Sequence, residues 1–195
     1  MIGAIVFSIG SGVMTWSFLE YLLHRWGGHD RRLRRTPHGA EHLQHHIQGD
    51  YFAPAWKKLV FAALLATIAG AITIPLAGEL GVAYVGGLIG FYGFYEWLHR
   101  RDHTHAGIGG YGRWARKHHF RHHLVDARSN FGVTSPLWDH VFGTYRAPGV
   151  IKVPPRLCMS WLLDDNGQVD ARYAGTFVMA SKPSSNTPPP ETSPA

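Results

Sequence analysis

Residues 59–103 read LVFAALLATIAGAITIPLAGELGVAYVGGLIGFYGFYEWLHRRDH. Between Leu59 and Tyr95 the only charged residue is Glu79, which divides the stretch into two apolar runs. About 20 apolar residues in a helix cross the ~30 Å hydrocarbon core of a bilayer. The stretch therefore predicts a hairpin of two membrane helices, which we place at about residues 59–76 and 80–98.

The N-terminal segment predicts a further membrane helix, at about residues 2–23. It contains no charged residue before Glu20. It also lacks the basic start and the small-residue cleavage site of a secretory signal peptide, so we expect a permanent membrane anchor.

The positive charges of the chain predict its orientation in the membrane. Every lysine and arginine lies between Arg25 and Lys58 or after His99. Positive residues flank membrane helices mainly on the cytoplasmic side. We therefore expect a multi-pass integral membrane protein whose N-terminus lies outside and whose C-terminus is cytoplasmic. The net charge of +6 follows from this topology, and we expect no nucleic-acid partner.

Ten of the fourteen histidines lie beside these apolar segments in four boxes with short, ligand-like spacings. Neutral imidazole is a common ligand of zinc, iron and copper, and residues at i, i+3 and i+4 share one helical face. The pattern predicts a histidine-only metal centre at the cytoplasmic membrane surface. The boxes are His24-x4-His29, His42-x2-His45-His46, His99-x3-His103 and His119-x2-His122-His123.

The other four histidines are placed outside this centre. His118 points about 100° away from His119 on a helix. His38 lies one turn before His42, where we expect a supporting or surface role, and His105 and His140 have no partner at a matching spacing.

Two carboxylates near the boxes, Glu20 and Glu96, are candidates to accept the second ring N–H of a metal-bound histidine. The alternative is that each glutamate is an ordinary polar residue at the membrane edge.

The remaining sequence predicts a small cytosolic part. Residues 106–112 contain GIGGYG, which we interpret as a turn before a basic helix at 114–126 that carries the last box. Cys158 is the only cysteine, which excludes an internal disulfide and an iron–sulfur cluster in the monomer. We divide the chain into a membrane domain (1–150), a cytosolic extension (151–181) with a short hairpin around 164–167, and a disordered tail (182–195).

The order of the four boxes resembles the fatty acid hydroxylase superfamily, and most closely its fatty acid 2-hydroxylase branch. Residues 130–145, NFGVTSPLWDHVFGTY, are also similar to the segment that follows the last box in these proteins. The resemblance covers about Glu20 to Tyr145.

The resemblance implies an all-α fold, in which integral membrane helices carry a cytosolic, histidine-rich dimetal site capped by short helices. It implies an O2-dependent di-iron monooxygenase that hydroxylates a long-chain fatty acyl lipid, with the 2-position as a candidate. Iron supplies the redox chemistry that zinc lacks, although zinc can occupy imidazole sites on purification. No catalytic side chain beyond the metal ligands is implied. Carried over by motif, these ligands are His24, His29, His42, His45, His46, His99, His103, His119, His122 and His123.

An external electron donor is expected, because the sequence shows no haem-, flavin- or nicotinamide-binding motif. We expect a donor of ferredoxin or cytochrome type.

Two alternatives stay open. A sterol or carotenoid hydroxylase or desaturase of the same superfamily is disfavoured by the spacing of the first and third boxes. A non-catalytic metal-binding membrane protein belongs to a different class. Metal transport would place ionisable ligands within the membrane helices, whereas here the boxes lie at the helix ends.

Overall fold

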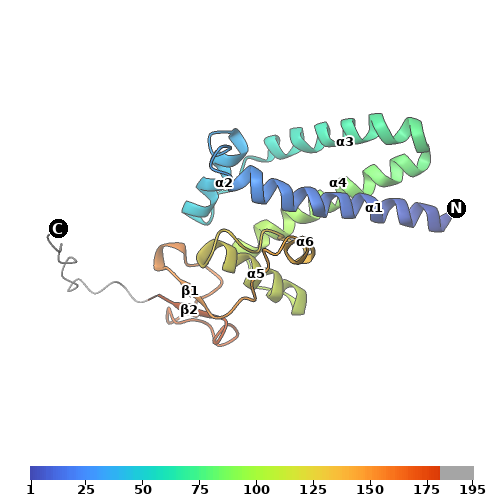
Figure 1. Ribbon diagram of the computed structural model, residues 1–195. Coiled ribbons are helices and arrows are strands. Elements are labelled where there is room, and N and C mark those ends of the chain that lie inside the picture. Colours follow the sequence, from blue (N-terminus) through green and yellow to red (C-terminus); the bar gives the residue numbers. More distant parts are fainter. Residues whose placement is uncertain (181–195) are drawn as a thin grey trace.

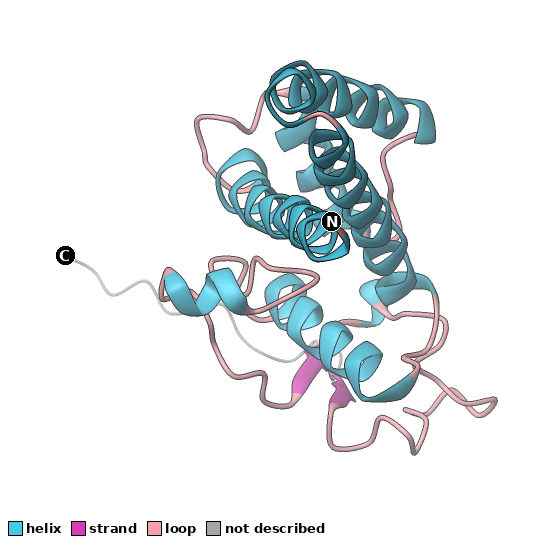
Figure 2. Cartoon of the chain, turned by 90° about the vertical axis from the view of Figure 1, so that its right-hand side faces the viewer, coloured by secondary structure: helices cyan, strands magenta, loops and turns pink. Residues whose placement is uncertain are grey.

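The computed structural model describes residues 1–180, and the predicted tail at 182–195 lies outside them. Three long helices extend side by side from a cap of shorter elements (Figure 1). They are α1 (Ile2–Leu22), α3 (Ala55–Ala77) and α4 (Glu79–Thr104). With the N-terminus of α1 toward the viewer, the shorter elements that follow α4 lie on one side of the long helices (Figure 2). The predicted all-α architecture is confirmed.

Glycines allow the backbones of α1 and α4 to touch. A Cβ on Gly12 would lie 2.1 Å from the carbonyl oxygen of Tyr84, and one on Gly87 would lie 2.2 Å from that of Ile9. Small residues are enriched where membrane helices approach closely. Beside these contacts, Trp16 packs on Leu88 and Tyr92 and forms the buried core between the long helices.

The α3–α4 hairpin agrees with the predicted one, but its helices are longer. α3 begins at Ala55, and α4 continues through the third box to Thr104. Within residues 1–180, two helical stretches are long and apolar enough to cross a membrane, Ile2–Gly28 and Ala55–Ala77. α4 falls short of that apolar character because glycines, tyrosines and a charged last turn replace aliphatic residues.

The cap contains α2 (Pro37–Gln48), α5 (Gly109–Leu124) and α6 (Leu137–Val141). The Thr36 side chain caps α2 by accepting from the Gly39 N–H at 3.1 Å, which is a preferred way to start a helix. The predicted turn at 106–112 was wrong in its second half, because residues 109–112 form the first turn of α5. Gly109, with φ of 64°, lets the chain enter that helix.

The C-terminal extension folds against the back of α5. Its strands, β1 (Ile151–Val153) and β2 (Phe177–Met179), pair in parallel, and a 3-10 turn, η2 (Pro155–Leu157), follows β1. The sequence predicted a hairpin here. Its turn is present, closed by a single antiparallel bridge between Leu163 and Val169. The buried cluster that joins this extension to α5 contains Phe120, Ile151, Val153, Met159, Leu162, Tyr173 and Phe177.

Candidate metal centre

The four boxes converge into two neighbouring groups of five histidines, in which one ring nitrogen from each residue lies within 4.8 Å of the others. We call these groups site 1 and site 2. Site 1 contains His24, His29, His42, His46 and His122, and site 2 contains His45, His99, His103, His119 and His123. All ten histidines singled out from the sequence are thus brought together.

Helical periodicity explains how the two three-histidine boxes serve both sites. In α2, His42 and His46 are four residues apart and point to site 1, whereas His45 points to site 2. α5 reverses the assignment, since His119 and His123 point to site 2 and His122 to site 1. Residues at i and i+4 lie nearly in line on a helix, and i+3 lies to one side. Each of these two helices therefore contributes histidines to both sites.

A wide helical turn explains the first box. The chain leaves α1 in a π-helical turn, η1 (Leu23–Gly28), and His29 caps it. His24 and His29 are five residues apart, which would place them on different faces of an α-helix. A π-helix closes on i+5, so this turn brings both rings to site 1. Sequence spacing alone gave this pair the weakest support.

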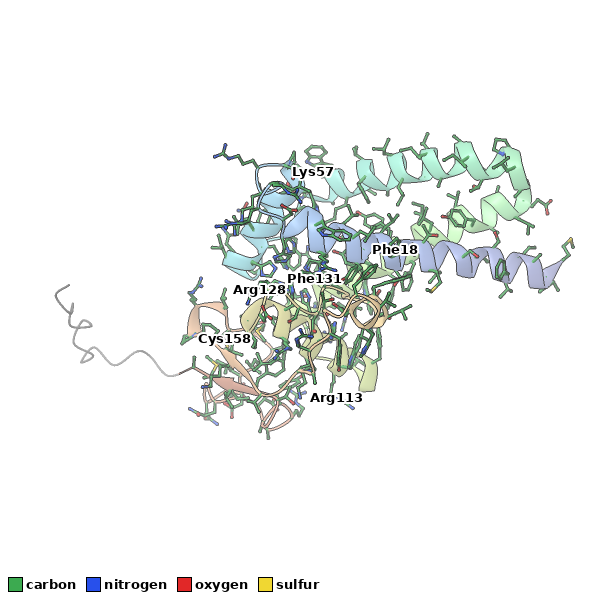
Figure 3. All side chains as sticks on the ribbon, in the orientation of Figure 1. Phe18, Lys57, Arg113, Arg128, Phe131 and Cys158 are labelled. Atoms are coloured by element: carbon green, nitrogen blue, oxygen red, sulfur yellow. The ribbon has the colours of Figure 1, made fainter. Side chains whose placement is uncertain are left out.

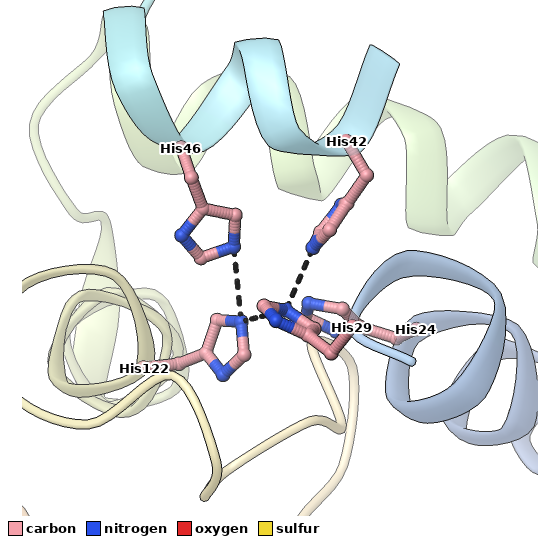
Figure 4. Close-up of side chains that lie close together, drawn as sticks. All are labelled: His24, His29, His42, His46 and His122. Atoms are coloured by element: carbon pink, nitrogen blue, oxygen red, sulfur yellow. Dashed lines mark hydrogen bonds between the residues drawn. The ribbon is translucent and has the colours of Figure 1, made fainter. Parts of the chain in front are cut away.

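The distances between the ring nitrogens suit a metal ion. In site 1 the Nε2 atoms of His42 and His29 are 2.8 Å apart, those of His29 and His122 2.9 Å, and those of His122 and His46 3.1 Å (Figure 4). In site 2 the corresponding separations are 2.9 Å for His99 and His45 and 2.9 Å for His103 and His119.

Two imidazole nitrogens, each about 2.1 Å from one metal ion, are about 3.0 Å apart at the right angles of octahedral coordination and about 3.4 Å apart at the tetrahedral angle. Two buried ring nitrogens, Nε2 of His24 and Nε2 of His123, also have no hydrogen-bond partner within the described residues. Both observations fit a metal ion in each site.

Backbone carbonyls fix the tautomer of three of these rings. The Nδ1–H groups of His24, His122 and His45 donate to the carbonyls of Phe131, Ser129 and Tyr51 respectively. A carbonyl only accepts, so Nδ1 carries the proton and Nε2 keeps its lone pair for a metal.

Burial keeps the clustered histidines outside the long helices neutral, among them His29, His45, His119, His122 and His123. It lowers the pKa of His29 to about 4, with a smaller contribution from the positive charge of Arg34. It also lowers the pKa of His45 to about 4, where Lys58 contributes. The pKa values of His119, His122 and His123 are lowered well below the usual range by burial and by the neighbouring imidazoles. Neutral imidazole is the form that binds a metal.

Residues 129–134 carry the carbonyls that orient two histidines of site 1, and two buried carboxylates hold this segment. Asp139 accepts from the N–H groups of Phe131 and Gly132 at 2.8 and 2.9 Å, from the Thr144 hydroxyl at 2.7 Å, and from His118 at 3.3 Å. Burial raises the pKa of Asp139, but these hydrogen bonds outweigh it and the net shift is downward. Asp139 therefore stays ionised and fixes the backbone beside His24.

Glu20 holds the next part of the same segment. Its carboxylate accepts from the N–H groups of Val133 and Thr134 and from the Thr134 hydroxyl. The sequence had suggested that Glu20 and Glu96 bind ring N–H groups directly. Instead Glu20 acts on the backbone of residues 133–134, and Glu96 pairs with Lys58.

Site 2 is supported mainly by helix contacts. Arg116 of α5, paired with buried Asp102, donates to the carbonyls of Arg101 and His105 at the end of α4. Trp161 of the extension donates to the His103 carbonyl at 3.1 Å. Phe52 packs with ring centroids 5.4–6.0 Å from three site 2 rings, those of His45, His99 and His103.

A cavity of about 470 Å³ between α1, α2, α3 and α4 leads to both sites. Its walls include the aromatic residues Trp16, Phe61 and Tyr92 of the long helices, and the ion pairs of Lys57 and Lys58 also border it. Four of the clustered histidines, His24, His42, His45 and His99, also line it. A mostly apolar cavity of this size suits a lipid chain.

The four histidines placed outside the centre are absent from both groups. His118 faces Asp139, and His105 and His140 are exposed. His38 is also exposed, with its ring 6.3 Å from that of His42. Sequence reasoning missed Asp139, whose signal was present only in the similarity of residues 130–145.

Comparison with known proteins identifies the family to which this chain belongs. A family model described as fatty acid hydroxylase matches residues 9–144. The chain belongs to the fatty acid hydroxylase family. A ceramide very long chain fatty acid hydroxylase of Schizosaccharomyces pombe is 36% identical over 149 residues, which cover 68% of this chain and 40% of that protein. The fatty acid 2-hydroxylase of Homo sapiens is 32% identical over 146 residues, covering 68% of this chain and 38% of that protein.

A solved structure shows the same fold. The hydroxylase domain visible in a structure of full-length scs7p matches with a TM-score of 0.63 and 30% identity, covering 75% of this chain and 58% of that one. This member of the fatty acid hydroxylase family spans about two fifths of the length of the two curated relatives given above.

Proposed function

We propose that this protein is a membrane hydroxylase that inserts one oxygen atom from O2 into a long fatty acyl chain, using two iron ions. The ligands are the five histidines of site 1 and the five of site 2. The observation that carries the proposal is the mostly apolar cavity that is also lined by histidines of both sites. A metal-storage protein has no need of a lipid-sized cavity that opens on its metal ligands.

Iron is the metal we expect, because imidazole also binds zinc but only a redox-active ion can activate O2 toward a C–H bond. When bound, the irons supply that redox chemistry, and the chain positions the substrate. The second oxygen atom would leave as water, with two protons and with two electrons from an external ferredoxin- or cytochrome-type protein.

The lining of the cavity favours a carbon close to the lipid headgroup. Charged side chains, Lys57 and Lys58 with Glu41 and Glu96, border the same cavity as the aromatic walls. A polar headgroup near these ion pairs would leave the first carbons of the acyl chain facing the histidines. Relatives are named fatty acid 2-hydroxylases, which supports the 2-position.

The hairpin supports a multi-pass membrane protein. α3 is long and apolar enough to cross, and α4 returns beside it to the same end (Figure 1). Both helices would then cross the bilayer, and the positive residues would place the cap in the cytoplasm. Residues 1–150 form the membrane hydroxylase domain in this proposal, and residues 151–181 form a cytosolic extension.

The test is lipid mass spectrometry of cells that express the protein. We expect acyl chains that gain one oxygen atom, with fragmentation that places it at the 2-position, and two irons per purified chain. His122→Ala should abolish the product and lower the metal content. His105→Ala, which changes an exposed histidine outside both sites, is the matched control and should leave the product unchanged.

The alternatives give different results. A modified ring in sterol or carotenoid extracts would support the other enzyme classes of the superfamily. Two bound metal ions without oxygen uptake or a modified lipid, in the presence of a reductant, would support a non-catalytic metal-binding protein.

A further inference from the structure

The cap presents an apolar edge toward the far ends of the long helices. It is made of the start of α5 and the short helix α6 (Figures 1 and 2). Ile108 and Val141 are 74% and 60% exposed, and Tyr111, Leu137 and Phe142 are 40–48% exposed. Soluble surfaces seldom gather so many large apolar side chains in one place, so this edge needs a partner. We call these five residues the cap edge.

The cap edge is continuous with the surface of the long helices. Trp138 and Phe142 of the α6 region lie against Phe18 of α1, with ring centroids 4.7 and 6.2 Å apart. Figure 3 shows Phe18 at the junction between α1 and the cap. At the other segment, Tyr111 lies beside Phe94 of α4, at 6.4 Å. Both contacts join the edge to helices that the proposed function places in the bilayer.

The depth of these contacts can be counted along α4. Glu79 is exposed at the hairpin tip, and its charge favours one surface of the membrane. From there about 20 residues, at about 1.5 Å each, cross the ~30 Å hydrocarbon core and end near His99. Phe94 lies five residues before His99, about 7 Å inside the core on this count. Tyr111 packs at that level, which is below the membrane surface rather than above it.

α1 gives the same depth. Trp138 donates to the Ser17 hydroxyl at 3.2 Å, and Ser17 lies seven residues before His24, about 10 Å along the helix. The tryptophan and tyrosine side chains of this region also match the aromatic residues that membrane proteins place at the lipid interface.

We infer that the cap edge dips into the cytoplasmic leaflet, so that α6 and the start of α5 contact lipid directly. The inference rests on the proposed membrane-embedded function. In this arrangement the cap has its own contact with the bilayer, at the boundary between headgroups and acyl chains, in addition to the spanning helices. Amphipathic segments commonly lie at that depth.

Nitroxide labels in proteoliposomes test the inference. Cys158 is the only cysteine, so Cys158→Ser gives a background in which Val141→Cys and Ile108→Cys are labelled singly. Two controls use the same background: Asp165→Cys on the exposed turn of the extension and Leu64→Cys on exposed α3. Electron paramagnetic resonance then compares collisions with O2, which partitions into lipid, and with a water-soluble nickel chelate.

We expect the O2-to-nickel collision ratio at 108 and 141 to exceed that at 165 by several-fold and to approach that at 64. A ratio at 108 and 141 equal to that at 165 would overturn the inference. Shielding of these labels from both reagents would also overturn it and would indicate a protein partner. If the label at 64 itself resembled that at 165, the membrane-embedded function would fail instead. Thermal unfolding and metal content check that each labelled variant is folded.

Discussion

Sites 1 and 2 contain five imidazoles each, but the protein supports them differently. Site 1 is oriented by carbonyls of an irregular segment, residues 129–134, that Glu20 and Asp139 hold through hydrogen bonds. The histidines of site 2 come from three helices, which Arg116 and the Phe52 ring hold together. Site 1 thus depends on one irregular segment, and site 2 depends mainly on contacts between helices. Substitutions that remove one of these supports should therefore weaken metal binding at one site more than at the other.

The largest separation is expected for Asp139→Ala. This change leaves two buried N–H groups and a buried hydroxyl without their acceptor, and each lost partner costs about 1–3 kcal/mol. We expect a free energy of unfolding lower by about 3 kcal/mol or more and a metal content that falls toward one ion per chain. Thermal unfolding and elemental analysis measure both. Asp126→Ala removes an exposed pair with Arg128 and an exposed hydrogen bond from the Arg128 N–H, and should change stability by less than about 1 kcal/mol.

Double variants show which site the loss affects. Adding His122→Ala to Asp139→Ala should cost no further metal, because both changes act on site 1. Adding His103→Ala should remove the remaining ion. Equal losses in the two double variants would contradict the separate support of the sites.

Glu20→Gln should weaken site 1 less. The amide keeps one acceptor oxygen but loses the charge that strengthens three hydrogen bonds to residues 133–134. We expect metal affinity at site 1 to fall about tenfold, measured by competition with a chelator. The matched change Glu79→Gln, at the exposed hairpin tip, should leave both affinities as they are. An unchanged site 1 would show that these hydrogen bonds do not orient His24.

Phe52→Ala tests the support of site 2. Aromatic contacts contribute about 0.5–1.5 kcal/mol each, so we expect a several-fold weaker affinity at site 2 and none of this effect at site 1. Phe7→Ala, on an exposed part of α1, is the control. A larger effect on site 1 would reverse our comparison.

The smallest difference between the sites is expected in how each contributes to the loss of stability at low pH. The pKa values of His29 in site 1 and His45 in site 2 are both lowered to about 4, whereas an unfolded histidine titrates near 6.5. The unfolded chain therefore binds more protons between these values, and the stability of the metal-free protein should fall as the pH is lowered through this window. His29→Gln and His45→Gln should each flatten the dependence of melting temperature on pH to a similar extent. A flattening confined to one variant would separate the sites after all.

The sequence predicted much of this arrangement because histidine spacing reflects helical geometry. The four boxes and the apolar hairpin follow local periodicity, and the structure forms the hairpin and brings the boxes together. The distribution of ligands between two sites was not predicted. It depends on how α2 and α5 face each other across the centre, which is a tertiary relation with no local signal.

The supports of site 1 were harder to find. Asp139 lies 115 residues from His24 and acts on it through the backbone of Phe131. No residue preference marks the π-helical turn, and the partners of Glu20, Val133 and Thr134, lie 113 and 114 residues further along the chain.

The glycine contacts between α1 and α4 affect how the protein can adapt to membranes of different thickness. The first box follows α1 and the third box ends α4, so the register of these helices sets how far each ligand projects. A slide by one residue would move them about 1.5 Å relative to each other, whereas metal–ligand distances tolerate only about 0.2 Å. Because the two backbones interlock at Gly12 and Gly87, we expect the pair to adapt to a thinner bilayer by tilting as one body, which leaves the two groups of histidines in place.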